Sequence, residues 1–91
     1  MSAVLIAYDL HKIGQRYTAL RDLIKKTFPN PWNALESTFI VNTTLSPVQI
    51  RELLVPALDS NDSLLVVALT PYGWATLGMP ASANEWLQSN V

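Results

Sequence analysis

Ala3–Leu10, AVLIAYDL, is the stretch that decides the fold of this chain. Its residues are apolar or aromatic up to Asp9, which is its single charged residue. Side chains alternate between the two faces of a strand, so this segment has two apolar faces and places Asp9 at one end. Such a pattern is typical of a central strand that is covered on both sides. We therefore predict a buried first strand that carries a carboxylate to the end of a sheet.

The composition predicts a small domain that associates with a second copy. The chain has 91 residues, of which 49% are hydrophobic and 14% are charged. Because an average soluble domain is about 25% charged, this chain has apolar surface that a homodimer would cover. Cysteine is absent, which excludes disulfides and thiolate metal sites.

The sequence shows no membrane or secretion signal. No apolar run approaches the length of a bilayer span, and the first ten residues lack the charged start and the cleavage site of a secretory signal. The expected location is therefore the cytoplasm, without a membrane partner.

Positive charge is concentrated in the first 26 residues. The basic residues there are Lys12, Arg16, Arg21, Lys25 and Lys26. With two acidic residues, these five give residues 1–26 a charge of +3, and one basic and five acidic residues give the rest −4. Such a cluster permits phosphate binding, although a solvated helix face is its more common meaning.

Periodicity predicts a helix followed by an extended region. Apolar residues recur at three- and four-residue steps over about Tyr17–Thr27, after a loop that contains Gly14. Pro29 and Pro31 end that helix. Trp32–Thr44 is rich in aromatic and β-branched residues, as strands are. It forms either one long strand or a hairpin that breaks near residue 36.

A second helix and a second buried strand follow. Ser46 is an N-cap residue, Pro47 suits the first helical position, and Gln49 completes a capping box. Leu64–Leu69, LLVVAL, is a continuous apolar run and is predicted to be another buried strand.

The tail, residues 71–91, contains Trp74 and Trp86. Ser82–Glu85, SANE, predicts a second capping box before a short helix over about Ala83–Ser89. Because two tryptophans need cover, the tail either folds back on its own sheet or packs on a partner subunit. The shortage of polar residues favours the partner.

In order, the predicted elements are a strand, a helix, an extended region, a helix, a strand and the tail. If the extended region is a hairpin, this order is the split βαβ, ferredoxin-like pattern: an α+β sandwich with two helices on one face of an antiparallel sheet. We therefore expect a ferredoxin-like domain over residues 1–70, with the tail as an addition. The other face of the sheet would then be bare, which is a second reason to expect a dimer.

The order of five features resembles a known family. The features are the first strand ending in Tyr8-Asp9, the glycine-containing loop and helix, Leu35–Asn42 (LESTFIVN), the helix that starts at Ser46, and Asn61-Asp62-Ser63 before the last strand. This set resembles the CRISPR-associated Cas-two family and the related virulence-associated D-type ribonucleases. The resemblance covers about residues 3–70 and lies in the order of the features, since each motif alone is weak.

The resemblance implies a ferredoxin-like homodimer whose sheets stack face to face and whose C-terminal segment can pair with the other protomer's sheet. Some family members are described as metal-dependent endonucleases on RNA or DNA, and others as non-enzymatic dimers that bridge integrase subunits. The family's proposed metal ligand corresponds to Asp9, and Ser37 and Phe39 match its Ser-x-Phe element. Residues 33–91 depart from the family because they contain one basic residue, Arg51, which weakens the expectations of an integration-complex role and of tight duplex binding. The departure favours a stand-alone relative of the family.

Asp9 is the central candidate for chemistry. Two copies across a two-fold axis could hold one Mg²⁺, which would activate water against a phosphodiester. A strand-terminal aspartate also commonly caps the next loop, so both interpretations stay open. His11 could serve as a general acid or lie exposed in a loop.

The remaining candidate residues fall into two groups. The candidate nucleic-acid-binding residues are Lys12, Arg16, Arg21 and Lys25, and the candidate hairpin or dimer residues are Ser37, Phe39 and Trp74. Three hypotheses follow: an Mg²⁺-dependent endoribonuclease of the toxin or defence type, a non-enzymatic dimeric scaffold, and a ferredoxin-like ligand-binding module.

Overall fold

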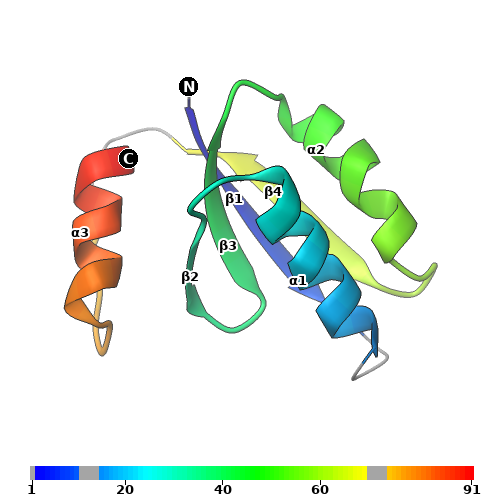
Figure 1. The fold of residues 1–91 in the computed structure, drawn as a ribbon, viewed down its shortest axis with the longest axis horizontal. Helices are drawn as coiled ribbons and strands as arrows, with labels where there is room; N and C mark the ends of the chain where they lie inside the picture. The colour runs from blue at the N-terminus through cyan, green and yellow to red at the C-terminus, as the bar shows by residue number, and fades with distance from the viewer. Residues whose placement is uncertain (1, 11–14, 70–73) are drawn as a thin grey trace.

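The structure is a computed structural model that describes residues 2–10, 15–69 and 74–91, with the backbone alone at 15–17. Its strands are β1 (Ser2–Asp9), β2 (Trp32–Leu35), β3 (Thr38–Thr43) and β4 (Ser63–Ala68). Its α-helices are α1 (Gln15–Thr27), α2 (Pro47–Leu54) and α3 (Ala81–Asn90), and a short 3-10 helix, Val55–Ala57, follows α2 (Figure 1).

The described strands form one antiparallel sheet in the order β2-β3-β1-β4. β1 is central, since Leu5 lies opposite Ile40 of β3 and opposite Val67 of β4. The extended region is a hairpin that turns at residues 36–37. The predicted central strand, the hairpin and the ferredoxin-like order are therefore confirmed.

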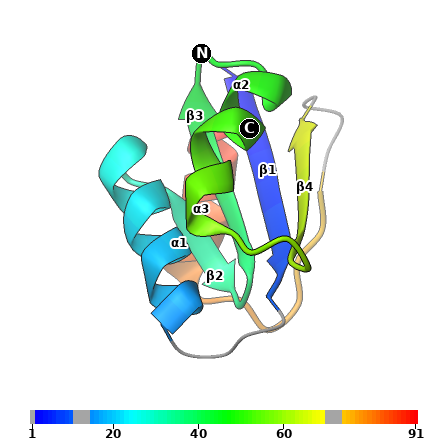
Figure 2. The same ribbon diagram turned by 90° about the vertical axis from the view of Figure 1, so that its right-hand side faces the viewer.

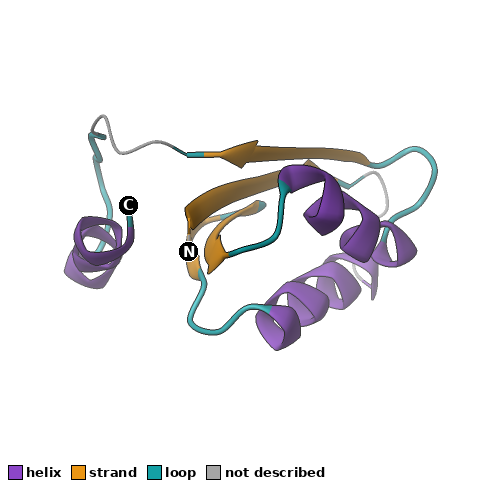
Figure 3. Ribbon diagram, turned by 90° about the horizontal axis from the view of Figure 1, so that it is seen from above, coloured by secondary structure: helices purple, strands orange, loops and turns teal. Residues whose placement is uncertain are grey.

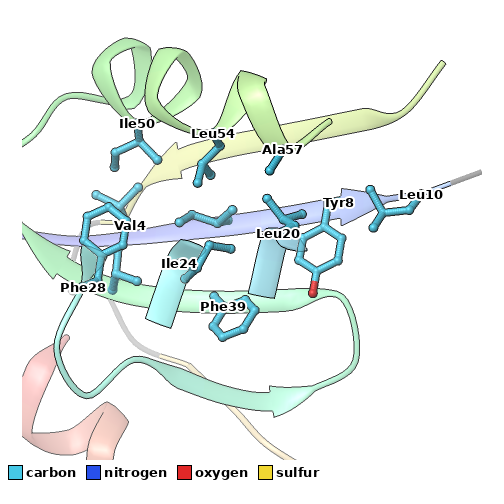
Figure 4. Packing of buried hydrophobic residues seen from close by; sticks show 12 residues of the cluster. Val4, Tyr8, Leu10, Leu20, Ile24, Phe28, Phe39, Ile50, Leu54 and Ala57 are labelled. Carbon is cyan, nitrogen blue, oxygen red and sulfur yellow. The ribbon is translucent and has the colours of Figure 1, made fainter. Parts of the chain in front are cut away.

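Helices α1 and α2 cover one face of this sheet (Figure 2). Alternate residues of β1 face these helices, and Tyr8 is among them: its ring stacks on Phe39 with 6.4 Å between the centroids. The core residues are Val4, Ile6, Tyr8, Leu10, Leu20, Ile24, Phe28, Phe39, Val41, Ile50, Leu54 and Ala57 (Figure 4). Burying each large side chain of this set contributes about 1.5–3 kcal/mol, so this layer dominates the stability of the fold.

The start of α2 has the predicted capping box. The backbone N–H of Gln49 donates to Ser46 Oγ at 3.2 Å, and the backbone N–H of Ser46 donates to Gln49 Oε1 at 2.8 Å. Two N–H groups that the helix itself leaves unpaired are satisfied in this way. The cap fixes where α2 begins and therefore how it lies on β4.

We expect Ser46→Ala to lower the free energy of unfolding by about 1 kcal/mol, because the alanine cannot accept the Gln49 N–H. Urea denaturation followed by circular dichroism measures this change. Ser60→Ala, at an exposed turn position, is the matched control and should change stability by less than about 0.5 kcal/mol.

The second face of the sheet is partly covered by α3, which lies on the β2 side (Figures 1 and 3). Trp32 Nε1 donates to the carbonyl of Ala83 at 3.2 Å, and Trp86 Nε1 donates to the carbonyl of Asn30 at 2.8 Å. A second cluster of buried residues forms here from Ala3, Trp32, Ile40, Ala83 and Leu87. The expectation of a bare second face is thus wrong for this half of the sheet, because the indole of Trp32 lies there and needs both cover and an acceptor. Packing of the tail on a partner subunit stays a prediction.

Two local predictions are also wrong. α3 has no capping box at Ser82: Pro80 is the N-cap residue and makes no side-chain cap bond, so the helix begins at Ala81. The physical reason is that the backbone is extended at Pro80 and helical from Ala81 onward. Ser82 therefore lies inside the first turn, where it cannot be the N-cap residue. β4 is not a buried strand, since it forms one edge of the sheet and exposes 57% of Leu65 and 39% of Val67.

The described residues form a compact unit with a radius of gyration of 13.0 Å, as expected for a domain of this length. Among the helices that these residues form, none combines the length and the apolar character that crossing a bilayer requires.

Candidate functional site

Asp9 ends β1 with its side chain exposed on the second face of the sheet. It lies opposite Ser63 of β4, two residues along from the pair formed by Ala7 and Leu65. Residues directly opposite in antiparallel strands point to the same face, so a carboxylate, a hydroxyl and an exposed leucine share one surface. A hollow of about 300 Å³ lies at this end of the two strands and includes Asp9, Ser63 and Leu65 in its lining.

We call the exposed surface of Ala7, Asp9, Ser63, Leu65 and Val67 the β1–β4 patch. Cross-strand pairing in one register places these residues together. α3 packs on β2 rather than on this half of the sheet, so the apolar members of the patch stay in solvent. The patch therefore combines apolar area with a single carboxylate.

One chain does not supply a complete metal site within the part that the structure describes. No three histidine, cysteine, aspartate or glutamate residues there lie close enough to hold an ion. A carboxylate oxygen of Asp9 is a suitable ligand for Mg²⁺, but one carboxylate binds it weakly without further ligands. A metal site at Asp9 would need donors from a second molecule.

The predicted basic residues are not gathered at Asp9. Arg21 is half-buried in the middle of α1, and Lys25 is exposed in the last turn. α1 lies on the opposite face of the sheet from the β1–β4 patch, and the ten steps along this helix from Gln15 to Lys25 span about 15 Å. His11, Lys12 and the side chain of Arg16 lie outside the described residues.

The three predicted hairpin or dimer residues have different surroundings. Ser37 forms the hairpin turn with a left-handed φ of 62°, and its carbonyl accepts the N–H of Tyr8 at 3.1 Å. Phe39 is fully buried beneath the helices, so its side chain packs within its own chain. Trp74 exposes 46% of its surface and is one of the residues that line a groove of about 260 Å³ between the sheet and α3.

Sequence reasoning missed Ser63, Leu65 and Val67 as parts of the candidate site. The apolar run Leu64–Leu69 indicates burial, and nothing within it signals an edge position. The signal that could have found them is the fold itself, because the last strand of the ferredoxin-like order lies at the edge beside β1.

No protein-family model matches this chain, and a comparison with curated proteins also finds no match. The interpretation of the site therefore depends on its residues and geometry.

Proposed function

We propose that this protein is a stand-alone relative of the Cas-two family: a cytoplasmic homodimer that cleaves RNA with Mg²⁺ held by two copies of Asp9. The observation that carries this proposal is the position of Asp9. Its carboxylate is exposed at the end of the central strand, on the same face as the uncovered Leu65 and Val67. Association through that face would place two such carboxylates near one another.

The β1–β4 patch favours self-association. Leu65 and Val67 expose 57% and 39% of their surface, and each is paired across the strands with an apolar residue of β1. Covering apolar area gains about 25 cal/mol per Å². A second copy offers the same apolar area in return, because an interface around a two-fold axis uses one surface twice.

We expect Leu65→Asp to dissociate the dimer. A carboxylate in the covered patch would be desolvated without a partner, at a cost of about 2–4 kcal/mol, which raises the dissociation constant roughly 30- to 1,000-fold. Sedimentation equilibrium measures this shift. Leu77→Asp is the matched control, since Leu77 exposes 94% of its surface and lies outside the patch. Equal dimerisation of the Leu65→Asp variant and the wild type would contradict this interface.

The residues at the patch fit Mg²⁺ by donor type. Asp9 and Ser63 present oxygen atoms, which are the ligands that this ion prefers, and Mg²⁺ commonly takes one or two carboxylates and keeps several waters. When bound, Mg²⁺ would neutralise charge on a phosphodiester and make a bound water more acidic. Asp9 would hold the ion, and the apolar side chains of Leu65 and Val67 would exclude bulk water from the interface.

The exposed basic face of α1 supports a nucleic-acid substrate. Lys25 and Lys26 are exposed and Arg21 is half-buried on this helix. Because these charges lie away from Asp9, they would attract the phosphate backbone rather than contact the cleaved bond. The small number of basic residues argues against a tightly held duplex.

Removal of metal tests the proposed activity. We expect the full chain to cleave end-labelled single-stranded RNA in Mg²⁺ and to leave it intact in EDTA, with activity restored by added Mg²⁺. Electrophoresis of the products measures cleavage. A dimer that leaves both RNA and DNA intact in Mg²⁺ would contradict the nuclease proposal.

That result would favour a non-enzymatic dimeric scaffold, which is the second candidate function. A specific observation supports it: residues 33–91 contain one basic residue, Arg51, and it is exposed and paired with Glu52 at 2.8 Å. Such a surface offers few contacts to phosphates and relies on apolar area for binding.

A further inference from the structure

A groove runs between α3 and residues 27–34, the segment that leads from the end of α1 into β2. We propose that this groove binds unpaired nucleotides of single-stranded RNA and anchors the strand away from Asp9. The choice of RNA rests on the proposed function, whereas the residues that make the contact differ from those that would hold the metal.

The groove consists of two hollows that share Asn30. The first, of about 280 Å³, lies between residues 30–34 and the first half of α3, including Ser82 and Trp86. The second, of about 420 Å³, is lined by residues 27–30 and 42–45 and by Asn90 of α3. Trp86 and Asn90 are one helical turn apart, so one side of α3 faces both hollows. Trp86 Nε1 donates to the carbonyl of Asn30 at 2.8 Å and joins the two walls of the groove.

Two indole rings line the first hollow. Trp32 is buried and Trp86 is half-buried, and the ring N–H of each already donates to a backbone carbonyl of this chain. The indoles therefore offer ring atoms to a ligand and no hydrogen-bond donor. A nucleobase can use such a surface, because it stacks on an aromatic ring through its flat face.

The other polar groups of the groove are uncharged. The side chains of Asn30 and Ser82 are exposed and make no hydrogen bond within the described part of the chain. Asn42 Nδ2 donates to Asn90 Oδ1, which leaves Oδ1 of Asn42 as an acceptor. An amide side chain has both a donor and an acceptor, which suits the edge of an unpaired base. Because none of the described lining residues is charged, the bases rather than the phosphates would enter the groove.

Positive charge lies beside the second hollow. Lys25 and Lys26 are exposed in the last turn of α1, and the next residue, Thr27, lines the hollow. A strand whose bases enter the groove would hold its phosphates in solvent, where these lysines attract them. Glu85, the single charged residue of α3, lines neither hollow. The lysines favour a nucleotide over a neutral sugar, which would make no use of them.

The groove lies apart from the β1–β4 patch and from Asp9. α3 packs on β2, and β4 forms the opposite edge of the sheet (Figure 1). Thr43, in the lining of the second hollow, pairs with Ser2 at the start of β1. Asp9 ends that strand seven residues later, which is about 23 Å along it. The nucleotides bound in the groove would therefore not be those that are cleaved.

Binding of a fluorescein-labelled RNA decamer of adenosines to the full chain, followed by fluorescence anisotropy in EDTA, tests the proposal without cleavage. The same ribose-phosphate strand without its bases keeps the charge and should bind at least roughly fivefold more weakly, because stacking is lost. Equal binding of the two strands would overturn the proposal. Competition by AMP at the same concentration as the unlabelled decamer would also overturn it, because the ligand would then be a free nucleotide.

Two variants test where the bases bind. Trp86→Leu removes the ring and should weaken binding of the decamer at least roughly fivefold, whereas Trp74→Leu, at a tryptophan outside both hollows, should leave it unchanged.

Asn30→Asp places a carboxylate where the hollows meet and should also weaken binding at least roughly fivefold, while Asn61→Asp, at an exposed turn, is the matched control. Asn30 has a left-handed φ of 49°, which aspartate tolerates, so this variant serves if Trp86→Leu does not fold. Wild-type affinity in either folded variant would overturn the proposal.

The two lysines are tested by salt. Replacement of both Lys25 and Lys26 by glutamine should reduce the slope of log affinity against log salt by about 1.4, because each phosphate contact of a single strand contributes about 0.7. An unchanged slope would overturn this path of the strand.

The binding experiment is separable from the proposed function. Base-dependent binding that Trp86→Leu weakens, in a protein that does not cleave RNA in Mg²⁺, would support the groove and contradict the nuclease. Cleavage by a protein whose Trp86→Leu and Asn30→Asp variants bind RNA as the wild type does would support the nuclease and contradict the groove.

Discussion

Replacement of Asp9 by asparagine should reduce Mg²⁺-dependent RNA cleavage at least roughly 100-fold. Asparagine keeps the shape of the side chain and removes the negative charge, and the stabilisation that a bound metal gives to a phosphodiester transition state is worth several kcal/mol. Asp9 is exposed at the end of β1, so the change leaves the core intact. Initial rates of RNA cleavage by the purified variant measure the loss.

The matched control is Asp22→Asn, at an exposed aspartate of α1 on the opposite face of the sheet. It makes the same chemical change and should keep cleavage within about twofold of the wild type. Both variants should unfold at the same urea concentration as the wild type, because neither changes a buried group. Equal cleavage by the Asp9→Asn variant and the wild type would remove Asp9 from the reaction and leave the scaffold as the better candidate.

Local signals in the sequence predict most of the fold. The Ser46 capping box depends on residues that are neighbours in the chain, and it forms as predicted. Alternation gives β1 two apolar faces, so its central position and the position of Asp9 at its end could be predicted, whereas the exposure of Asp9 could not. The hairpin was harder, because its turn depends on the left-handed backbone of Ser37, a conformation that serine does not signal.

The features that the sequence does not predict depend on contacts between segments that are distant in the chain. LLVVAL has the pattern of a buried strand, yet its exposure is decided by the edge position of β4 and by where α3 packs. α3 in turn lies where the Trp32 indole needs an acceptor, which is the Ala83 carbonyl 51 residues away. The composition indicates an apolar surplus but does not locate it, so the β1–β4 patch becomes visible only in the folded chain.

Phe39→Ala should lower the free energy of unfolding by about 3–5 kcal/mol. The side chain is 0% exposed, stacks on Tyr8 of the adjacent strand and lies beside Ile24 of α1 (Figure 4). Its removal leaves a cavity that the stiff sheet and the two helices cannot fill by collapse. A domain of 91 residues has a total stability of about 5–14 kcal/mol, so this one change removes a large part of it. Urea unfolding followed by circular dichroism measures the loss.

Dependence on protein concentration separates core packing from a dimer role for Phe39. If the residue packs within its own chain, as its burial beneath α1 and α2 indicates, the loss is the same at every protein concentration. A residue at a subunit interface would give a loss that grows on dilution. Phe39→Leu keeps most of the buried volume and should cost about 1–1.5 kcal/mol, so it gives a folded comparison if the alanine variant does not fold. A loss that grows on dilution for Phe39→Leu would show that the hairpin, rather than the β1–β4 patch, holds the two subunits together.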